Sequence, residues 1–392
     1  MKVFMINTVC GIKSTGRICT DLARILDERG HQCLIAYGRE HVPQKLEKYA
    51  YFFGNKYSLK KDAVFTKLFD NAGFNSAAAT NRLIRKIKEF DPDIIHLHNL
   101  HGCYIHVGRL FKFLEKWGKP VVWTLHDCWS FTGHCANFAV AGCEKWQEGC
   151  HHCTQRKSYP VALLADRSKS NYRKKKALFT KPKNMTVVTP SRWLAELVQQ
   201  SFLKDYPVKV IHNGIDLSVF KPVQGNIREK YGLEGKKILL GVASTWDKRK
   251  GLADFLKFSK MLDDSCAIML VGLSNQQIAE LPSNVIGIAR TNSIEELAQI
   301  YSAADVFLNL TYEDNYPTVN LEAQACGTPV ITYRTGGSVE SVPDENVVSQ
   351  GDFKALAELL EHGQLTLSDQ SFDKTVLFEQ YLELYRQLIL KI

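Results

Sequence analysis

Short apolar segments alternate with longer amphipathic ones along this chain, and the alternation limits the possible folds more than any other feature. In the first half, strands are expected at residues 2–7, 33–37, 94–98, 121–125 and 185–189. Apolar residues at helical spacing predict helices at 16–29, 107–117 and 191–200. A strand–helix–strand order of this kind predicts a parallel sheet with helices on both faces.

The second half repeats the pattern. Strands are expected at 237–243, 267–271, 306–310 and 329–332, and helices at 251–262, 293–303 and 318–325. The sequence therefore predicts an α/β fold with two doubly wound domains that join near Pro207. We place the first domain at 1–206, with a cysteine-rich insertion at 128–153, and the second at 207–371. A long amphipathic helix at 372–392 has no strand after it.

Length and composition agree with two ordinary globular domains. The chain has 392 residues, 45% hydrophobic and 23% charged, which excludes collagen-like, coiled-coil and wholly disordered classes. No apolar run approaches the roughly 20 residues that cross a bilayer, and residues 1–7 are too short for a signal peptide. We expect a soluble cytoplasmic protein. The net charge of +9 fits a polyanionic partner, whether nucleotide phosphates, nucleic acid or an anionic membrane.

The turn after the first strand contains two glycines, Gly11 and Gly16, before the helix begins. Glycine lets the backbone approach a ligand, and a helix N-terminus favours phosphate, so Gly16 is a donor-binding candidate. Lys13 in the same turn is an acceptor-side candidate. A plain glycine turn capped by Ser14 or Thr15 is the alternative.

Three motifs in the second half are more specific. They are residues 210–222 with the core His-Asn-Gly-Ile-Asp, residues 311–330 from Thr-Tyr-Glu-Asp-Asn-Tyr-Pro to Cys-Gly-Thr-Pro-Val, and residues 335–340, Thr-Gly-Gly-Ser-Val-Glu. In combination and order they resemble the retaining family-4 glycosyltransferases of the GT-B type, as found in bacterial polysaccharide synthesis. The resemblance covers essentially the whole chain. It implies two Rossmann-like domains facing a central cleft, with the terminal helix crossing back to the first domain.

The resemblance also implies a nucleotide-sugar site at residues 314–322. The helix that begins at Thr318 can receive the donor diphosphate at its N-terminus. Glu322 matches the family glutamate that accepts hydrogen bonds from both ribose hydroxyls. Asp314 stands where the family has a glutamate that contacts the transferred sugar. Asn315, Tyr316 and Pro317 complete the donor-binding candidates. Outside this motif, we would interpret Glu322 as a solvated helix carboxylate and Asp314 as a turn former.

Residues 244–251, Ser-Thr-Trp-Asp-Lys-Arg-Lys-Gly, resemble the phosphate clamp of the same family. Lys250 matches the family lysine and is expected to stabilise the leaving diphosphate during catalysis. The family arginine is missing, because Ser244 or Thr245 stands near its place, and Lys248 or Arg249 could substitute. A solvated helix start is the alternative for these basic residues.

Histidines follow two strands of the first domain. His126, at the carboxyl end of its strand, resembles the family histidine that reaches the transferred sugar, and we expect Asp127 to orient its ring. His98 and Asp127 are acceptor-side candidates, whereas His96 is expected in the core. The resemblance implies no metal in the chemistry.

Four cysteines, Cys135, Cys143, Cys150 and Cys153, have the spacing C-x7-C-x6-C-x2-C. Some family members carry a similar insertion. A closed four-thiolate zinc site would be structural, because no position remains for water. Reduced buried cysteines or two disulfides fit the spacing as well, and a histidine could replace one ligand: His134, His151 or His152.

A basic run covers eight residues: Arg167, Lys169, Arg173, Lys174, Lys175, Lys176, Lys181 and Lys183. It is either a solvated helix face or a surface that docks on the anionic inner leaflet, where a lipid-linked acceptor would lie. The leading hypothesis is therefore a cytoplasmic enzyme, either free or peripheral on the inner face of the plasma membrane, that moves a sugar from a nucleotide-diphosphate sugar to a saccharide or lipid-linked saccharide. The alternatives are a nucleotide-sugar epimerase or phosphorylase of similar architecture and a zinc-containing nucleic-acid-binding protein. Only Tyr172 and Phe179 interleave the basic run, so no nucleic-acid partner is expected.

Overall fold

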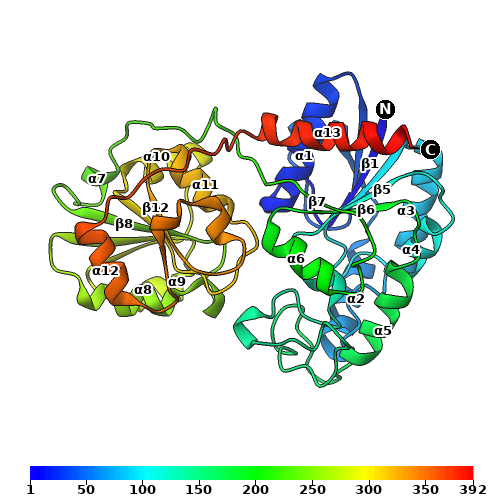
Figure 1. Cartoon of the computed structure of the whole chain (residues 1–392), viewed down its shortest axis with the longest axis horizontal. Helices are drawn as coiled ribbons and strands as arrows, with labels where there is room; N and C mark the ends of the chain where they lie inside the picture. Colours follow the sequence, from blue (N-terminus) through cyan, green and yellow to red (C-terminus); the bar gives the residue numbers. More distant parts are fainter. Residues whose placement is uncertain (392) are drawn as a thin grey trace. The chain divides into compact units, whose positions relative to one another are not determined.

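The computed structural model describes residues 1–391, apart from the side chain of residue 56. It divides into two compact units, Met1–His212 with Leu377–Ile392, and Asn213–Val376. The two units are coloured along the sequence in Figure 1 and are described one at a time. Residue 392, the end of the predicted terminal segment, lies outside the described residues.

The first unit is built on a seven-stranded parallel sheet within the described residues, in the order β3-β2-β1-β4-β5-β6-β7. Its strands are β1 (Lys2–Asn7), β2 (Gln32–Tyr37), β3 (Ala50–Phe52), β4 (Ile94–Leu97), β5 (Val121–Thr124), β6 (Met185–Thr189) and β7 (Val208–Val210). Its helices are α1 (Lys13–Glu28), α2 (Lys56–Phe69), α3 (Ala77–Phe90), α4 (Val107–Leu114), α5 (Ser168–Phe179), α6 (Arg192–Gln200) and α13 (Lys374–Ile389), the last of which begins in the second unit.

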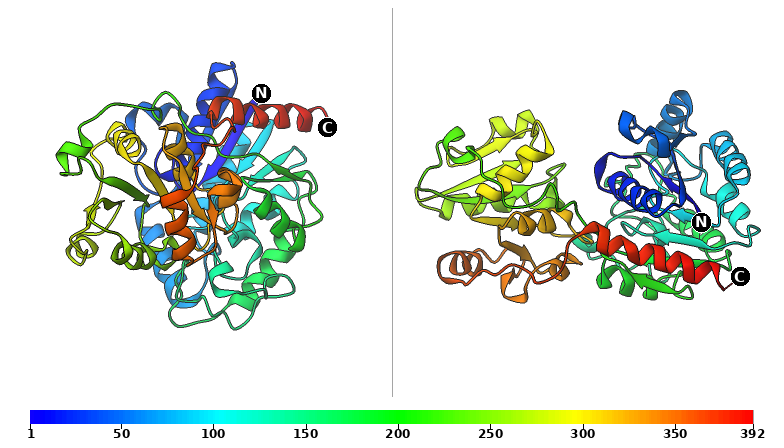
Figure 2. Two further views of the ribbon diagram at one scale, coloured as in Figure 1. Left: turned by 60° about the vertical axis from the view of Figure 1, so that its left-hand side comes forward. Right: turned by 90° about the horizontal axis from the view of Figure 1, so that it is seen from above.

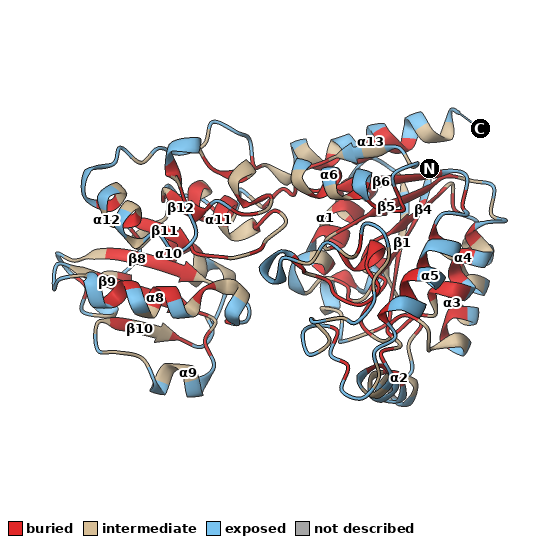
Figure 3. Cartoon of the chain, turned by 60° about the horizontal axis from the view of Figure 1, so that its bottom comes forward, coloured by how far each residue is buried: buried red, intermediate tan, exposed pale blue. Residues whose placement is uncertain are grey.

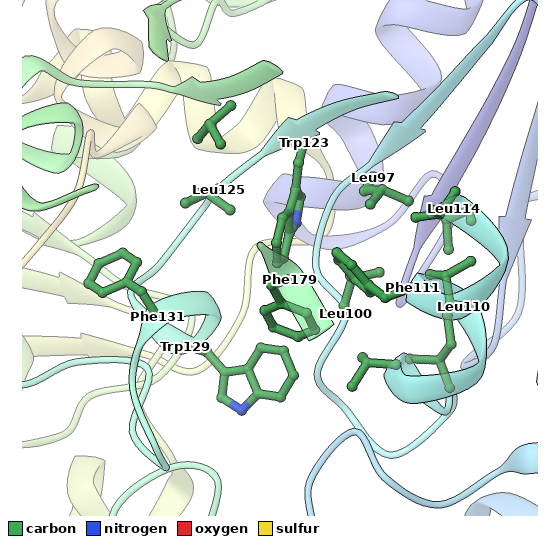
Figure 4. Packing of buried hydrophobic residues seen from close by; sticks show 14 of the residues in the cluster. Leu97, Leu100, Leu110, Phe111, Leu114, Trp123, Leu125, Trp129, Phe131 and Phe179 are labelled. Atoms are coloured by element: carbon green, nitrogen blue, oxygen red, sulfur yellow. The ribbon is translucent and has the colours of Figure 1, made fainter. Parts of the chain in front are cut away.

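Both faces of the first sheet are apolar, as expected when helices cover each side. On one face, aromatic rings pack between β5, α4 and α5: Phe111 and Phe179 lie 4.2 Å apart between ring centroids, with Trp123 beside them (Figure 4). The other face is covered by α1 and α13, and Tyr381 and Tyr385 pack with the strand residues there. Figure 2 shows α13 lying along this unit, with the N-terminus on the same unit.

The second unit has a six-stranded parallel sheet within the described residues, in the order β10-β9-β8-β11-β12-β13. Its strands are β8 (Lys237–Val242), β9 (Cys266–Val271), β10 (Val285–Ile288), β11 (Val306–Asn309), β12 (Val330–Tyr333) and β13 (Val347–Val348). Its helices are α7 (Ile227–Lys230), α8 (Leu252–Phe258), α9 (Asn275–Ala279), α10 (Ile294–Ala303), α11 (Thr318–Ala325) and α12 (Phe353–His362). The predicted α/β class with two doubly wound domains is confirmed, and in both sheets the order reverses beside the unit's first strand.

The unit boundaries differ from those predicted. The first unit continues to His212, because β7 pairs with β6 and forms the edge of the first sheet. The second unit continues to Val376, because the chain beyond Phe372 still pairs with Ile215 before α13 begins to pack on the first unit. Within residues 1–391, no helix is both long enough and apolar enough to cross a membrane.

Candidate active site

Three neighbouring histidines lie at the carboxyl ends of β4 and β5, and two of them share a hydrogen bond. His98 Nδ1 is 3.0 Å from His126 Nε2, and the two rings are stacked. His96 stands two residues before His98. Its Nε2 is 2.8 Å from the Thr124 hydroxyl, and its Nδ1 is 2.6 Å from the Tyr385 hydroxyl of α13. The structure therefore places His96 in the core, as predicted. His126 is held in place by its hydrogen bond to His98, which directly follows β4.

His98 is only 1% exposed, and its second ring nitrogen, Nε2, is buried without a hydrogen-bond partner among the described residues. A buried N–H without an acceptor costs more than a buried lone pair without a donor. The favoured arrangement therefore puts the His98 proton on Nδ1, where it is donated to His126 Nε2. His126 then carries its own proton on Nδ1, as a donor for a ligand.

Burial lowers the pKa of all three rings. It brings the pKa of His96 to about 3 and that of His126 to about 4, and it places that of His98 well below its usual 6.5. Neighbouring histidines add to the effect on His96 and His98. The cluster is therefore neutral at physiological pH and offers uncharged hydrogen-bonding groups.

Asp127 does not orient His126 as predicted. Its Oδ2 is 2.6 Å from His101 Nε2, and its Oδ1 accepts from the Trp129 backbone N–H at 2.9 Å. His101 in turn reaches the Tyr159 hydroxyl at 2.9 Å. The sequence could not single out His101, because it lies in a loop with no motif around it. Asp127 thus fixes the loops beside His126, whereas the imidazole ring of His126 is held by His98.

The first glycine turn is closed on itself. Gly11 N donates to Gly16 O at 3.0 Å, and a Cβ on Gly16 would lie 3.0 Å from Val9 Cγ2, so Gly16 is buried in the turn. Lys13 begins α1 and pairs with Glu40 at 3.0 Å on the surface. The predicted cap by Ser14 or Thr15 is not formed, since Ile12 stands at the N-cap position.

The cysteine-rich segment contains a thiol pair. Cys135 donates to Cys153 and so lowers the pKa of the Cys153 thiol, whereas Cys150 accepts from Gly133 N at 3.1 Å. Cys143 packs against the apolar core. Within residues 1–391, no group of three or more histidine, cysteine or acidic side chains is arranged to hold a metal. Zinc at these four thiols stays a prediction that elemental analysis would test.

In the second unit, an ion pair lies at the carboxyl end of β11. Lys250, in the 3₁₀ turn η4 (Lys248–Lys250), is 2.5 Å from Asp314 Oδ2. Arg249 donates to the Glu313 carbonyl oxygen at 2.8 Å and lies 3.9 Å from the same carboxylate, while Lys248 is exposed. Burial would raise the pKa of Asp314, but the two cations outweigh it and hold that pKa below its usual value.

Two glycines fix this turn. Gly251 has φ of +73°, and a Cβ there would lie 2.0 Å from the Leu310 carbonyl oxygen. A Cβ on Gly336 would lie 2.1 Å from the Asp314 carbonyl oxygen, and the Gly337 N–H donates to that oxygen at 3.1 Å. The clamp residues and residues 335–340 are therefore packed directly against Asp314.

The donor-binding candidates surround α11. Pro317 occupies its N-cap position and offers no side-chain acceptor. The Asn320 N–H donates to the Pro317 carbonyl oxygen at 3.1 Å, so the N–H groups that a ligand can take at this helix start are those of Thr318 and Val319. One turn on, Glu322 is nine-tenths buried, and its Oε2 accepts from the Tyr301 hydroxyl at 2.9 Å. Asn315 N donates to Asp314 Oδ1 at 2.8 Å, whereas the Tyr316 ring belongs to the apolar core.

A buried amide network behind α11 was not predicted. Asn320 receives a hydrogen bond from Asn309 of β11 at 2.8 Å and donates to the Ser341 hydroxyl at 2.9 Å. Ser338 joins the same network through Thr332 at 2.7 Å. The network locks α11 to the loop at 335–341. Asn320 within the helical motif was the one available signal, since amides are rare in a helix interior without a partner.

Comparisons with known proteins agree with this architecture. Residues 15–219 match the model of Glycosyltransferase Family 4, and residues 223–364 match that of Glycosyl transferases group 1. WcaC of Escherichia coli (strain K12), whose name assigns it to colanic acid biosynthesis as a glycosyl transferase, is 26% identical over 338 residues, 79% of this chain and 80% of WcaC.

Two further proteins are similar over different extents. An N,N'-diacetylbacillosaminyl-diphospho-undecaprenol alpha-1,3-N-acetylgalactosaminyltransferase of Campylobacter jejuni is 25% identical over 221 residues, 50% of this chain and 58% of that protein. The crystal structure of Anabaena HepE in complex with UDP has a TM-score of 0.69 at 18% identity, covering 99% of this chain and all of HepE. The fold is of the GT-B type, and the chain belongs to glycosyltransferase family 4.

Proposed function

We propose that this protein is a retaining glycosyltransferase that moves a sugar from a nucleotide-diphosphate sugar to a saccharide acceptor in cell-surface polysaccharide synthesis. The observation that carries the proposal is the set of groups around α11: an uncapped helix start, the Lys250–Asp314 pair and the buried Glu322. Each of these groups suits one part of a nucleotide sugar. The family assignment favours this function over the epimerase and nucleic-acid-binding alternatives.

The diphosphate would lie at the N-terminus of α11, where the backbone N–H groups and the helix dipole favour negative charge. Lys250 would stabilise the charge that develops on the departing diphosphate. Arg249 lies close enough to Asp314 to add to the same positive field, in the place of the missing family arginine. Glu322 would accept from the two ribose hydroxyls, with its remaining bond to Tyr301 fixing the carboxylate.

Within the second unit, Asp314 is the proposed contact to the transferred sugar, with its carboxylate held by Lys250. Within the first unit, His126 is the proposed donor to a sugar hydroxyl, with its ring held by His98. In a retaining transfer at the front face, the acceptor oxygen bonds to the anomeric carbon on the side from which the phosphate oxygen departs. The acceptor proton passes to that phosphate oxygen. This route needs no protein nucleophile and no metal.

The acceptor is proposed to be a saccharide, free or lipid-linked. The bacillosaminyl-diphospho-undecaprenol named for the Campylobacter jejuni relative is a lipid-linked saccharide, and WcaC is named for colanic acid biosynthesis. These relatives support a bacterial polysaccharide or glycan context. Lys13 and the loops held by Asp127 are the candidates for acceptor contacts in the first unit.

The test is a product assay with a panel of UDP-, GDP-, ADP- and dTDP-sugars and short lipid-linked and free saccharides. We expect one donor to release nucleoside diphosphate in an acceptor-dependent way, and the product to keep the donor's anomeric configuration by NMR. Inversion would overturn the retaining mechanism. Interconversion of nucleotide sugars without transfer would instead support the epimerase.

A further inference from the structure

Helix α2 turns polar side chains toward the protein and large apolar side chains toward solvent, the reverse of an ordinary surface helix. Its polar side chains point inward: Asp62 and Thr66 are buried, and Asp62 accepts from Ser76 Oγ at 2.5 Å and from Asn75 Nδ2 at 2.9 Å. These hydrogen bonds satisfy the buried carboxylate, so the inward face is stably polar. A surface helix normally turns its apolar residues to the core and its polar residues to solvent.

The outward side of α2 is apolar. Tyr57 is 86% exposed, Val64 54%, Phe65 41% and Phe69 37%. Figure 3 shows where α2 lies on the first unit, with its ribbon coloured by burial. Phe65 and Phe69 are one helical turn apart, and their ring centroids are 5.7 Å apart. The apolar core of the first unit is contacted instead by the half-buried Leu59 of the same helix.

A second exposed segment continues this apolar surface. Leu163 and Leu164 are 47% and 68% exposed, and their backbone N–H groups donate to the carbonyl oxygens of Lys67 and Leu68 at 2.7 and 3.3 Å. The two segments are thus joined at the end of α2. We call the combined surface the α2 patch: Tyr57, Val64, Phe65, Phe69, Leu163 and Leu164.

The charges around the α2 patch are positive. Lys60, Lys61 and Lys67 are exposed on α2, whose single acidic residue is the buried Asp62. Lys61 Nζ lies 5.8 Å from the Phe65 ring centroid, and Arg167 lies 5.9 Å from that of Phe69. Two acidic residues stand next to these segments in the chain. Asp70, directly after α2, is buried and accepts from Arg167 N at 2.8 Å, and the exposed Asp166 accepts from Cys153 N and from Ser168.

We propose that the α2 patch docks on an anionic lipid bilayer, with its aromatic and leucine side chains in the headgroup boundary and its lysines on lipid phosphates. Apolar side chains ringed by cations, without exposed acids on the helix, match such a surface in both hydrophobicity and charge. The proposal does not depend on sugar transfer, although it would bring the enzyme to a lipid-linked acceptor.

This surface differs from the basic run predicted to dock. Lys175, in the middle of that run, is buried and donates to the carbonyl oxygens of Trp129 and Thr132, so it cannot reach a membrane. The exposed cations of α5 have no large exposed apolar residues between them; they are Lys169, Arg173, Lys174 and Lys176. The basic run can add electrostatic attraction to an anionic membrane, but only the α2 patch also offers exposed apolar side chains that can enter the headgroup boundary.

The test is flotation of the full-length protein with vesicles of phosphatidylglycerol and phosphatidylcholine, or of phosphatidylcholine alone. We expect binding to the anionic vesicles at low salt. The double variant Phe65→Ser with Leu164→Ser should weaken binding to anionic vesicles by roughly tenfold or more. The triple variant, with Lys60, Lys61 and Lys67 each changed to Gln, should weaken it by roughly a hundredfold at low salt. The controls are Val140→Ser, an exposed apolar residue elsewhere on the unit, and Lys169, Arg173 and Lys174→Gln.

Unchanged melting temperature would show that the variants remain folded. In addition, Phe65→Trp fluorescence should shift to the blue on anionic vesicles. The proposal is overturned if wild-type protein does not float with anionic vesicles, or if only the α5 variant loses binding. A dimer that the α2 substitutions dissociate, without vesicle binding, would instead assign the patch to a second copy of the chain.

Discussion

The two units use the same sheet topology but carry opposite kinds of chemistry at the ends of their strands. In the first unit, the groups beside β4 and β5 are neutral histidines, His98 and His126, whose pKa values are lowered by burial. In the second, the groups beside β11 are an ion pair, Lys250 and Asp314, and a buried carboxylate, Glu322. Neutral donors suit sugar hydroxyls, whereas fixed charges suit a diphosphate.

The physical cause of the difference is the surroundings of each group. His98 is enclosed by two other imidazole rings, and no carboxylate bonds to it, so its charged form is disfavoured. Asp314 is half-buried, with 18% of its side chain exposed, yet two cations hold its pKa below the usual value and keep it ionised. The comparison therefore predicts that removing charge in the second unit is far more costly to turnover than removing a hydrogen bond in the first.

The largest effect is expected for Lys250→Ala. Loss of a preorganised charge at the leaving group should lower kcat by roughly 10²–10³-fold. Lys257→Ala, an exposed lysine on the same unit, is the matched control and should leave kcat unchanged. If Lys250→Ala retains wild-type kcat at saturating substrate, the clamp must be formed by Arg249 or Lys248 instead.

Glu322→Ala should weaken nucleotide binding next. A charged hydrogen bond contributes about 1.5–3 kcal/mol, which corresponds to a rise in Kd of roughly ten- to a hundredfold. Tyr301→Phe is the control, because it removes the hydroxyl bonded to Glu322 but keeps the carboxylate. Calorimetry that gives the same Kd for Glu322→Ala and wild type would exclude the ribose contact.

The neutral histidines also predict a pH dependence of stability. Their pKa values in the folded protein lie below the usual 6.5, so the unfolded chain binds more protons as pH falls from about 6.5 toward about 4. The free energy of unfolding should therefore fall over this range, approaching about 1.4 kcal/mol per pH unit for each histidine. Urea denaturation should give a shallower dependence for His96→Asn, while His362→Asn, an exposed histidine, should match wild type.

The smallest effect is expected at His126. Because its hydrogen bond to a sugar hydroxyl is neutral, His126→Ala should cost about 0.5–1.5 kcal/mol in kcat/KM. His98→Leu should have a similar effect and should also change the ¹⁵N shifts that report which His126 nitrogen carries the proton. A His126 spectrum with the proton on Nε2 in the wild type would contradict the positioning role of His98.

Much of the fold was predictable because the strands are continuous apolar runs and the helices between them are amphipathic. Strands such as β1 and β8 were placed within a residue of their true ends. Short edge strands such as β3 and β13 were missed, since two or three residues carry no periodic signal. Helix α2 was missed for the opposite reason: its apolar residues face solvent, so it lacks an inward apolar stripe.

The site was predictable where its residues form one local motif. Residues 311–322 place Asp314 and Glu322 on a single strand–turn–helix segment, and the structure keeps them there. The partners of those residues could not be read from the sequence, because they come from distant segments. Tyr301 beside Glu322 and His101 beside Asp127 are examples, and the wrong pairing predicted for Asp127 followed from preferring a sequence neighbour.

The most direct test of the charge difference is calorimetry of UDP, GDP and ADP, each against its nucleoside, with wild type, Lys250→Ala and His126→Ala. The account predicts that one diphosphate binds wild type well above its nucleoside. Lys250→Ala should lose most of that difference, and His126→Ala should keep it. A diphosphate preference that survives Lys250→Ala but disappears in His126→Ala would contradict the assignment of the donor site to the second unit.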